Sequence, residues 1–108
     1  MFSIQEAKHN GQPALKLSGE LTIYSAAEAR TNLAKHADKK VVPELDLSGI
    51  EEIDTAGVQV LLWVKRESLG RGRPLALVNH SAAVVEVFDL LKVTGILGDP
   101  ILIAPDVS

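Results

Sequence analysis

Residues 52–68 read EIDTAGVQVLLWVKRES, and this stretch joins a strand-like run to the most apolar helix-like run of the chain. Apolar residues after Gly57 recur at helical spacing and spread well beyond a single stripe. They predict a helix that is covered on more than one side. Glycine is favoured directly after a helix, so Gly70 is expected to end it.

The start of this helix combines small and polar residues. Asp54 is expected to end the preceding loop and to accept backbone amides of the first helical turn, which places Thr55 at or near the first helical position. Small Ala56 and Gly57 leave the backbone unobstructed there. A phosphate on Thr55 brings a charge of about −1.5 to −2 to amides that favour anions. An Asp-Thr pair is also an ordinary helix cap, and spacing alone leaves both interpretations open.

Toward the N-terminus, the pattern predicts a β-hairpin followed by a helix. Phe2 and Ile4 alternate with polar neighbours, residues 14–17 alternate again, and Asn10-Gly11 between them is a turn signal. Ser25 and Glu28 then have the spacing of a capping box, and small or apolar residues follow at helical spacing. A first helix is therefore expected over about residues 25–37.

The remaining segments complete an alternation of strands and helices. A strand is expected over 41–47, with Pro43 at its start because proline lacks a ladder donor. Residues 71–73 predict a turn and 75–78 a buried strand. A helix capped by Ser81 and ending near Gly95, and a last strand over 101–104, follow. The order β-β-α-β-α-β-α-β predicts a single α/β domain over residues 1–108. It is a small mixed sheet of about five strands backed by three or four helices.

Composition excludes several classes of protein. The 108 residues include 46% hydrophobic residues, enough for a core, and a net charge of −3 offers no basic surface for nucleic acid or anionic lipid. No cysteine is present, so thiol catalysis and thiolate metal sites are excluded. The N-terminal residues do not resemble a signal peptide, and no apolar run approaches membrane-spanning length. We therefore expect a cytoplasmic protein without direct membrane insertion.

Three segments resemble a known family. They are LKLSGELTIYSAAEARTNL at 15–33, ELDLSGIEEIDTAGVQVLL at 44–62 and LALVNHSAAVVEVFDLLKVTGI at 75–96. Together they are similar to stand-alone STAS domains, the family of anti-sigma factor antagonists. Asp54-Thr55-Ala56-Gly57 resembles that family's Asp-Ser-Ser-Gly or Asp-Ser-Thr-Gly box. The hydroxyl residue after the aspartate is the phosphorylated one in the family, which implies Thr55 here.

The resemblance also implies a mode of action. The unphosphorylated domain binds a partner, often a serine/threonine kinase-type anti-sigma factor, and phosphorylation releases it. The expected partner-binding residues lie on the loop before the first helix and at the start of the second helix. They are Thr22, Ile23, Tyr24, Asp54, Thr55, Ala56, Gly57 and Gln59. For Tyr24, packing at the edge of the core is the alternative.

Two departures from the family's motifs widen the choice of partner. Ala56 replaces the second hydroxyl, and Gly19-Glu20-Leu21 is followed by Thr22 where classical antagonists carry aspartate. The variant GELTIYSAAE looks more like STAS proteins found beside chemotaxis-type signalling proteins, so a chemosensory signalling protein is a second expected partner. A constitutive STAS subunit that binds the ATPase of a lipid-transport complex, and a nucleotide-binding STAS domain, are the alternatives.

The sequence contains no motif that indicates an enzyme. His9, His36 and His80 show no paired metal-ligand spacing, so no metal site or cofactor is expected. The carboxylates of residues 46–54 are expected to be a solvated rim. Ser48 lacks a nucleophile elbow, and the Arg71-Gly72-Arg73 turn lacks the lysine and helix start of a phosphate loop. A non-enzymatic interaction module is the prediction.

Overall fold

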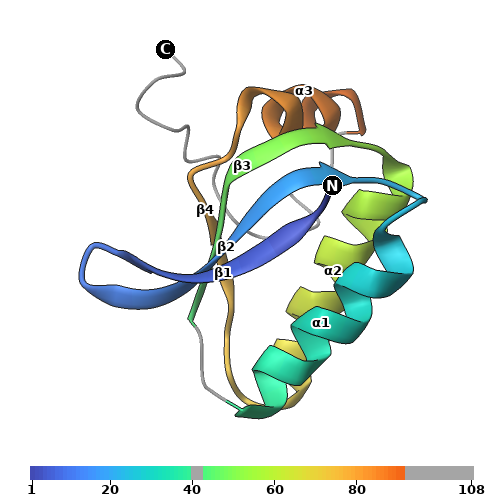
Figure 1. Ribbon diagram of the computed structural model, residues 1–108. Coiled ribbons are helices and arrows are strands. Elements are labelled where there is room, and N and C mark those ends of the chain that lie inside the picture. Colours follow the sequence, from blue (N-terminus) through green and yellow to red (C-terminus); the bar gives the residue numbers. More distant parts are fainter. Residues whose placement is uncertain (40–42, 92–108) are drawn as a thin grey trace.

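The computed structural model describes residues 1–39 and 43–91. Their elements, in chain order, are β1 (Ser3–His9), β2 (Gln12–Leu21), α1 (Ala26–Lys39), β3 (Glu44–Ile53), α2 (Thr55–Gly70), β4 (Ala76–Val78) and α3 (Ala82–Leu91). The strands form a four-stranded sheet in the order β1-β2-β3-β4 (Figure 1). β1 is antiparallel to β2, and the other pairs are parallel. The expected small mixed sheet backed by helices is confirmed. The expected last strand and the helix end near Gly95 lie outside the described residues.

The β1–β2 hairpin forms at the predicted turn. His9 pairs with Gln12, so Asn10 and Gly11 alone connect the strands. Both have positive φ angles, 52° for Asn10 and 80° for Gly11. Two successive left-handed residues match the right-handed twist of the flanking strands, which explains the Asn-Gly sequence at this place.

The two central strands are longer than expected. β2 continues to Leu21 and β3 to Ile53, where these two residues pair. Register shifts lie between Lys16 and Ser18 and between Gly19 and Glu20, and at both the additional residue is on β3. Such bulges let a strand bend while pairing continues. As a result, β2 and β3 end side by side, and Asp54 follows directly after β3.

All three helices contribute to one hydrophobic core. α1 and α2 pack against each other, and α3 lies along β3 (Figure 1). Leu17 of β2, Leu47 of β3 and Leu61 of α2 are completely buried, and Val84 and Phe88 of α3 join the same cluster. The predicted broad apolar surface of α2 is confirmed, since its buried residues face both the sheet and α1. α2 therefore packs against both α1 and the sheet.

Two helix ends differ from the prediction. The Ser25 hydroxyl does not form a capping box, because it donates to the carbonyls of Glu20 and Thr22 and accepts from the Thr22 amide. It orders the loop before α1 instead. At the end of α2, Gly70 is still helical, and the left-handed residue is Gly72, with φ of 70°. The amides of Gly72 and Arg73 bond the carbonyls of Leu69 and Ser68, which is a Schellman ending.

Candidate docking site

Asp54 connects the start of α2 to the loop before α1. One of its carboxylate oxygens, Oδ1, accepts a hydrogen bond from the Gly57 amide at 3.0 Å, which is the predicted helix cap. The other, Oδ2, accepts from the Ile23 amide, also at 3.0 Å. No local sequence pattern indicates this second bond, because Ile23 lies 31 residues away from Asp54. One side chain therefore fixes two segments that are distant in sequence.

Gly57 has a different role from the one expected. It is buried, and a Cβ built on it lies 2.1 Å from the carbonyl oxygen of Leu21. Real Cβ atoms essentially never come so close to another heavy atom, so any larger residue forces α2 away from the end of β2. The glycine permits close packing of helix on strand and does not serve to leave the helix start open.

The expected docking residues do come together at this junction, with different exposures. Ile23 and Tyr24 are 69% and 97% exposed, and Thr55 and Gln59 are exposed on the first turns of α2. Thr22, Asp54 and Ala56 are partly buried. The exposure of Tyr24 argues against core-edge packing. We call Ile23, Tyr24, Thr55 and Gln59 the junction surface.

The first position of α2 leaves Thr55 accessible. Its residue is the first of the helix, and the amide that the Asp54 cap satisfies belongs to Gly57. Helix N-termini carry free amides and a partial positive charge, so the site is compatible with an anion on the threonine side chain. The structure thus confirms the predicted place of Thr55 and also the capping role of Asp54.

A groove between α1 and α2 adjoins the junction surface, and the sequence analysis did not identify it. It has a volume of about 380 Å³ and includes Ala56 and Gln59 of α2. Arg30 of α1 stacks on Trp63 of α2, with its guanidinium carbon 4.5 Å from the ring centroid. Both side chains line the groove, together with Arg66. The helical spacing of residues 59, 63 and 66 was the available signal, but the matching face of α1 required the tertiary structure.

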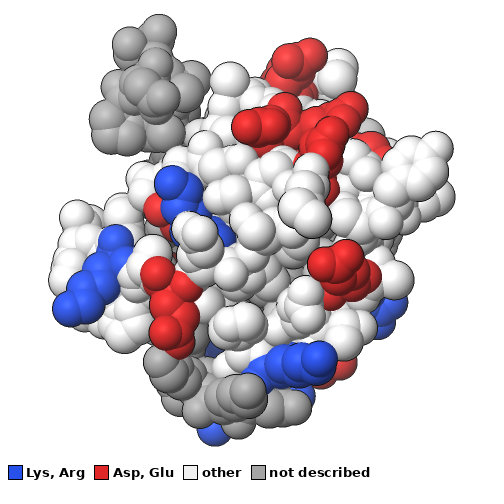
Figure 2. All heavy atoms as spheres, viewed as in Figure 1, with Lys and Arg blue, Asp and Glu red and all other residues white. Residues whose placement is uncertain are grey.

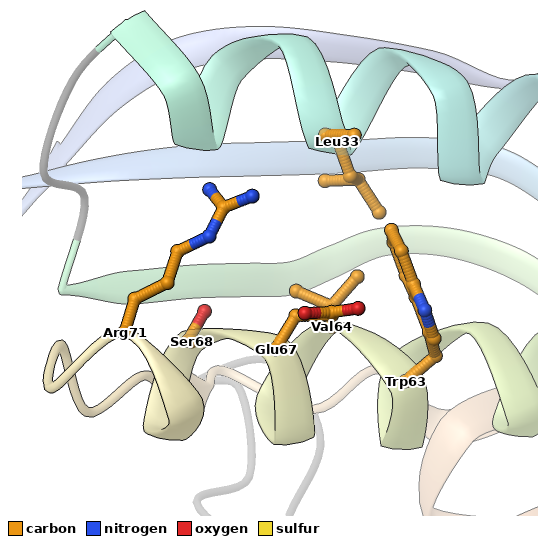
Figure 3. Close-up of a pocket in the computed structure, with 7 residues that line it drawn as sticks. Leu33, Trp63, Val64, Glu67, Ser68 and Arg71 are labelled. Atoms are coloured by element: carbon orange, nitrogen blue, oxygen red, sulfur yellow. The ribbon is translucent and has the colours of Figure 1, made fainter.

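Trp63 also lines a second, smaller pocket of about 70 Å³ farther along the two helices. Figure 3 shows the Trp63 ring standing between the helices, with Leu33 pointing toward it from α1 and Val64 beside it on α2. Arg71 lies at the far end of this pocket, and Glu67 lies between Arg71 and Trp63 (Figure 3). Trp63 therefore separates the two hollows and belongs to the walls of both.

Acidic side chains gather at a different part of the surface. Glu20, Glu51 and Glu52 are exposed where β2 and β3 end, and the Met1 ammonium at 2.6 Å holds the pKa of the Glu20 carboxyl below its usual value. Figure 2 shows a concentration of acidic groups over α3 and the neighbouring part of β3. Asp46 is buried and accepts from the Ser48 amide, so it is not part of the expected solvated rim.

The described residues show no feature that indicates metal binding, a phosphate loop or a membrane-spanning helix. Within residues 1–39 and 43–91, no group of three or more histidine, aspartate or glutamate side chains could hold a metal ion. The Arg71–Arg73 turn ends α2, and therefore offers no helix start for a phosphate. In the same part of the chain, no helix is long and apolar enough to cross a membrane.

Comparison with protein families gives one match over most of the chain. A family model described as "Mlab, STAS domain" matches residues 4–102. A search of curated protein sequences returns no significant match.

Solved structures with the same fold include an anti-sigma factor antagonist from Mycobacterium paratuberculosis. It has a TM-score of 0.74 and 20% identity over 98% of this chain and 89% of the other. A putative anti-sigma factor antagonist from Thermotoga maritima has a TM-score of 0.75 and 21% identity, covering 95% and 88%. The Bacillus cell fate determinant SpoIIAA in its phosphorylated form has a TM-score of 0.60 and 19% identity, covering 94% and 90%.

Proposed function

The chain belongs to the STAS domain family, and from this premise we propose that it is a non-enzymatic regulatory module that binds a partner protein through the junction surface. The observation that carries the proposal is the exposure of Thr55 at the first position of α2, beside the exposed Ile23 and Tyr24. An exposed aromatic next to an apolar side chain is typical of interface anchors. The Asp54 bond to the Ile23 amide holds these residues in place before a partner arrives.

We further propose that phosphorylation of Thr55 releases the partner. A phosphate is tolerated within the domain, because it sits at the positive end of α2. In a complex it places about two negative charges in a desolvated contact, which opposes binding. SpoIIAA, a protein of the same fold, is known in a phosphorylated form, which supports a switch of this kind. The partner we favour is a kinase-type anti-sigma factor or a chemosensory signalling protein.

The test is affinity purification from the native cell with wild type, Thr55→Ala and Thr55→Glu, with mass spectrometry of both bait and captured proteins. We expect wild type and Thr55→Ala to retain the same signalling protein. Thr55→Glu should bind it at least about tenfold more weakly, because the added charge is desolvated in the contact. A tenfold loss of affinity corresponds to about 1.4 kcal/mol. Phosphate on Thr55 in the bait is the direct readout of modification.

Thr31 provides a matched control, since it is an exposed threonine on α1 whose hydroxyl bonds the Ala27 carbonyl. Thr31→Glu adds the same charge away from the junction surface, and should leave binding unchanged. Equal capture of the partner by all the Thr55 variants contradicts the switch.

A second candidate is a constitutive subunit that binds the ATPase of a transport complex. One observation favours it: Asp54 and Gly57 already have complete structural explanations as a helix cap and a close-packing residue. The Asp-Thr-Ala-Gly motif therefore does not require a phosphate. In this case a transport ATPase binds wild type, Thr55→Ala and Thr55→Glu alike, which separates the two candidates in the same experiment.

A further inference from the structure

We propose that the groove between α1 and α2 binds an acidic segment of the partner protein, with carboxylates on Arg30 and Arg66 and an apolar side chain against Trp63. This inference rests on the proposed function, because it names the chemistry of the partner that the domain binds. It extends the contact from the junction surface along α2 as far as Arg66, opposite the first turns of α1.

The groove is continuous with the junction surface. Gln59 belongs to both, and Ala56, which also lines the groove, follows Thr55 directly. Thr55, Gln59 and Arg66 are separated by four and seven residues, so they lie along one face of α2. A partner that covers Thr55 and Tyr24 therefore meets the groove next, without leaving the same side of the domain.

The groove carries a positive charge that no described carboxylate neutralises by an ion pair. Arg30 and Arg66 are both exposed, and the described residues that line the groove include no carboxylate. Neither arginine forms an ion pair with the described side chains of residues 1–36 and 43–91. This holds although the protein as a whole has a net charge of −3. Acidic side chains are the complement of such a surface.

The stacking of Arg30 on Trp63 prepares the guanidinium for such a contact. A ring face at 4.5 Å restricts the plane of the guanidinium and leaves its N–H edges free to donate. A planar guanidinium can bind a carboxylate through two parallel hydrogen bonds, and prior orientation lowers the entropy that binding costs. Arg30 is therefore better suited than a freely rotating lysine to hold an acidic side chain.

The apolar walls favour a protein segment over a free anion. Ala26, Val60, Leu62 and Trp63 line the groove beside the arginines. Trp63 is partly buried and packs against the core, with Leu33 and Val64 near its ring (Figure 3). Tryptophan and arginine are the residue types that most often dominate binding energy at protein interfaces. A phosphate would contact only the arginines, whereas an acidic segment with one apolar side chain would contact both the arginines and the apolar walls.

The experiment selects a phage-displayed library of random peptides against the wild-type protein, and measures binding of the synthesised consensus peptide. We expect a consensus with Asp or Glu at two or more positions around one Leu, Phe or Trp. Trp63 is the single tryptophan of the chain, so its fluorescence reports occupancy of the groove when the peptide lacks tryptophan. Added salt should weaken binding, because the pairs are exposed.

Substitutions of the groove arginines test whether the peptide binds in the groove. Arg30→Gln and Arg66→Gln should each weaken binding by about tenfold, the effect of losing one charge-assisted contact. Arg66→Lys should retain part of the affinity. Lys35→Gln removes a positive charge from an exposed position of α1 outside the groove and should have no effect. A circular dichroism spectrum confirms that each variant is folded.

Three results overturn the inference: no peptide is enriched, the consensus lacks acidic residues, or the arginine variants bind it as the wild type does. Saturable binding of labelled GTP or inorganic phosphate that needs both arginines, without an enriched peptide, also overturns it and identifies an anion site. Capture of the native partner separates the two proposals. If only Thr55→Glu loses the native partner, the phosphorylation switch is supported and the groove proposal is contradicted. If only the arginine variants lose it, the groove proposal is supported and the switch is contradicted.

Discussion

At the scale of single residues, Gly57 and Asp54 make the junction possible by touching two segments each. Gly57 lets α2 start against the Leu21 carbonyl, and Asp54 accepts amides from α2 and from the loop at Ile23. Neither residue offers much surface to a partner, because Gly57 is buried and Asp54 is partly buried. They position the exposed residues Ile23, Tyr24 and Thr55 relative to one another.

We expect Gly57→Ala to lower the free energy of unfolding by about 1 to 3 kcal/mol, the usual cost of overpacking against groups that cannot move. The added methyl group meets the Leu21 carbonyl, which the β2–β3 pairing holds in place. Urea denaturation followed by circular dichroism measures the change.

Gly70→Ala is the matched control, because it adds the same methyl group to the same helix where nothing lies within 4 Å. Alanine is preferred over glycine in helices by about 0.5 to 1 kcal/mol, so stability should stay the same or rise slightly. Equal stability of Gly57→Ala and wild type contradicts the close-packing role of Gly57.

At the scale of elements, α2 serves three purposes, two of them on one exposed face and the third on its buried side. Its start presents Thr55, one face lines the groove with Gln59 and Arg66, and the buried residues Val58 and Leu61 hold it to the core. The helix is 16 residues long, so the junction surface and the basic groove are parts of one rigid body. Movement of the start of α2 therefore carries the groove with it.

The Asp54 cap can be tested as a link between elements. Asp54→Ala removes both hydrogen bonds, and should cost about 0.5 to 2 kcal/mol, the range for loss of an N-cap. Amide hydrogen exchange should accelerate at both Gly57 and Ile23, because each donates to this carboxylate. Asp54→Asn retains one oxygen acceptor and should have an intermediate effect. Acceleration at Gly57 alone contradicts the link to the loop.

At the scale of the whole molecule, a single core joins the sheet to all three helices. Phe88 of α3 and Leu61 of α2 belong to one cluster of buried residues, although they sit on different helices. Acidic groups gather near α3 and β3 (Figure 2), while the α1–α2 groove carries two arginines. The fold thus combines one hydrophobic core with two surfaces of opposite charge.

We expect this single core to unfold in one transition. Trp63 fluorescence reports α2, and circular dichroism reports all helices, so the two urea curves should coincide in the wild type. Phe88→Ala should lower the free energy of unfolding by about 3 to 5 kcal/mol, as seen for large aromatic side chains in cores. Both probes should shift together, although Phe88 is on α3. A fluorescence curve unchanged by Phe88→Ala contradicts a shared core.

The order of the described elements and the place of Thr55 were predictable from the sequence alone. Periodicity and capping preferences are local properties, so the hairpin turn, the three helices and the Asp54 cap were predictable from neighbouring residues. The ends of β2 and β3 were not predictable from neighbouring residues. Bulges let the pairing of these strands continue, and a bulge depends on the partner strand. The capping role assigned to the Ser25 side chain was wrong, because its hydroxyl bonds residues before the helix, the carbonyls of Glu20 in β2 and of Thr22 in the loop.

The role of Gly57 at the junction and the position of the groove depend on tertiary packing. The contact of Gly57 with Leu21 and the bond from Ile23 to Asp54 join segments more than 30 residues apart. Arg30 and Trp63 meet because α1 packs on α2, and no local pattern specifies which faces of two helices come together. Local chemistry selects the elements, and long-range packing selects the surface that they share.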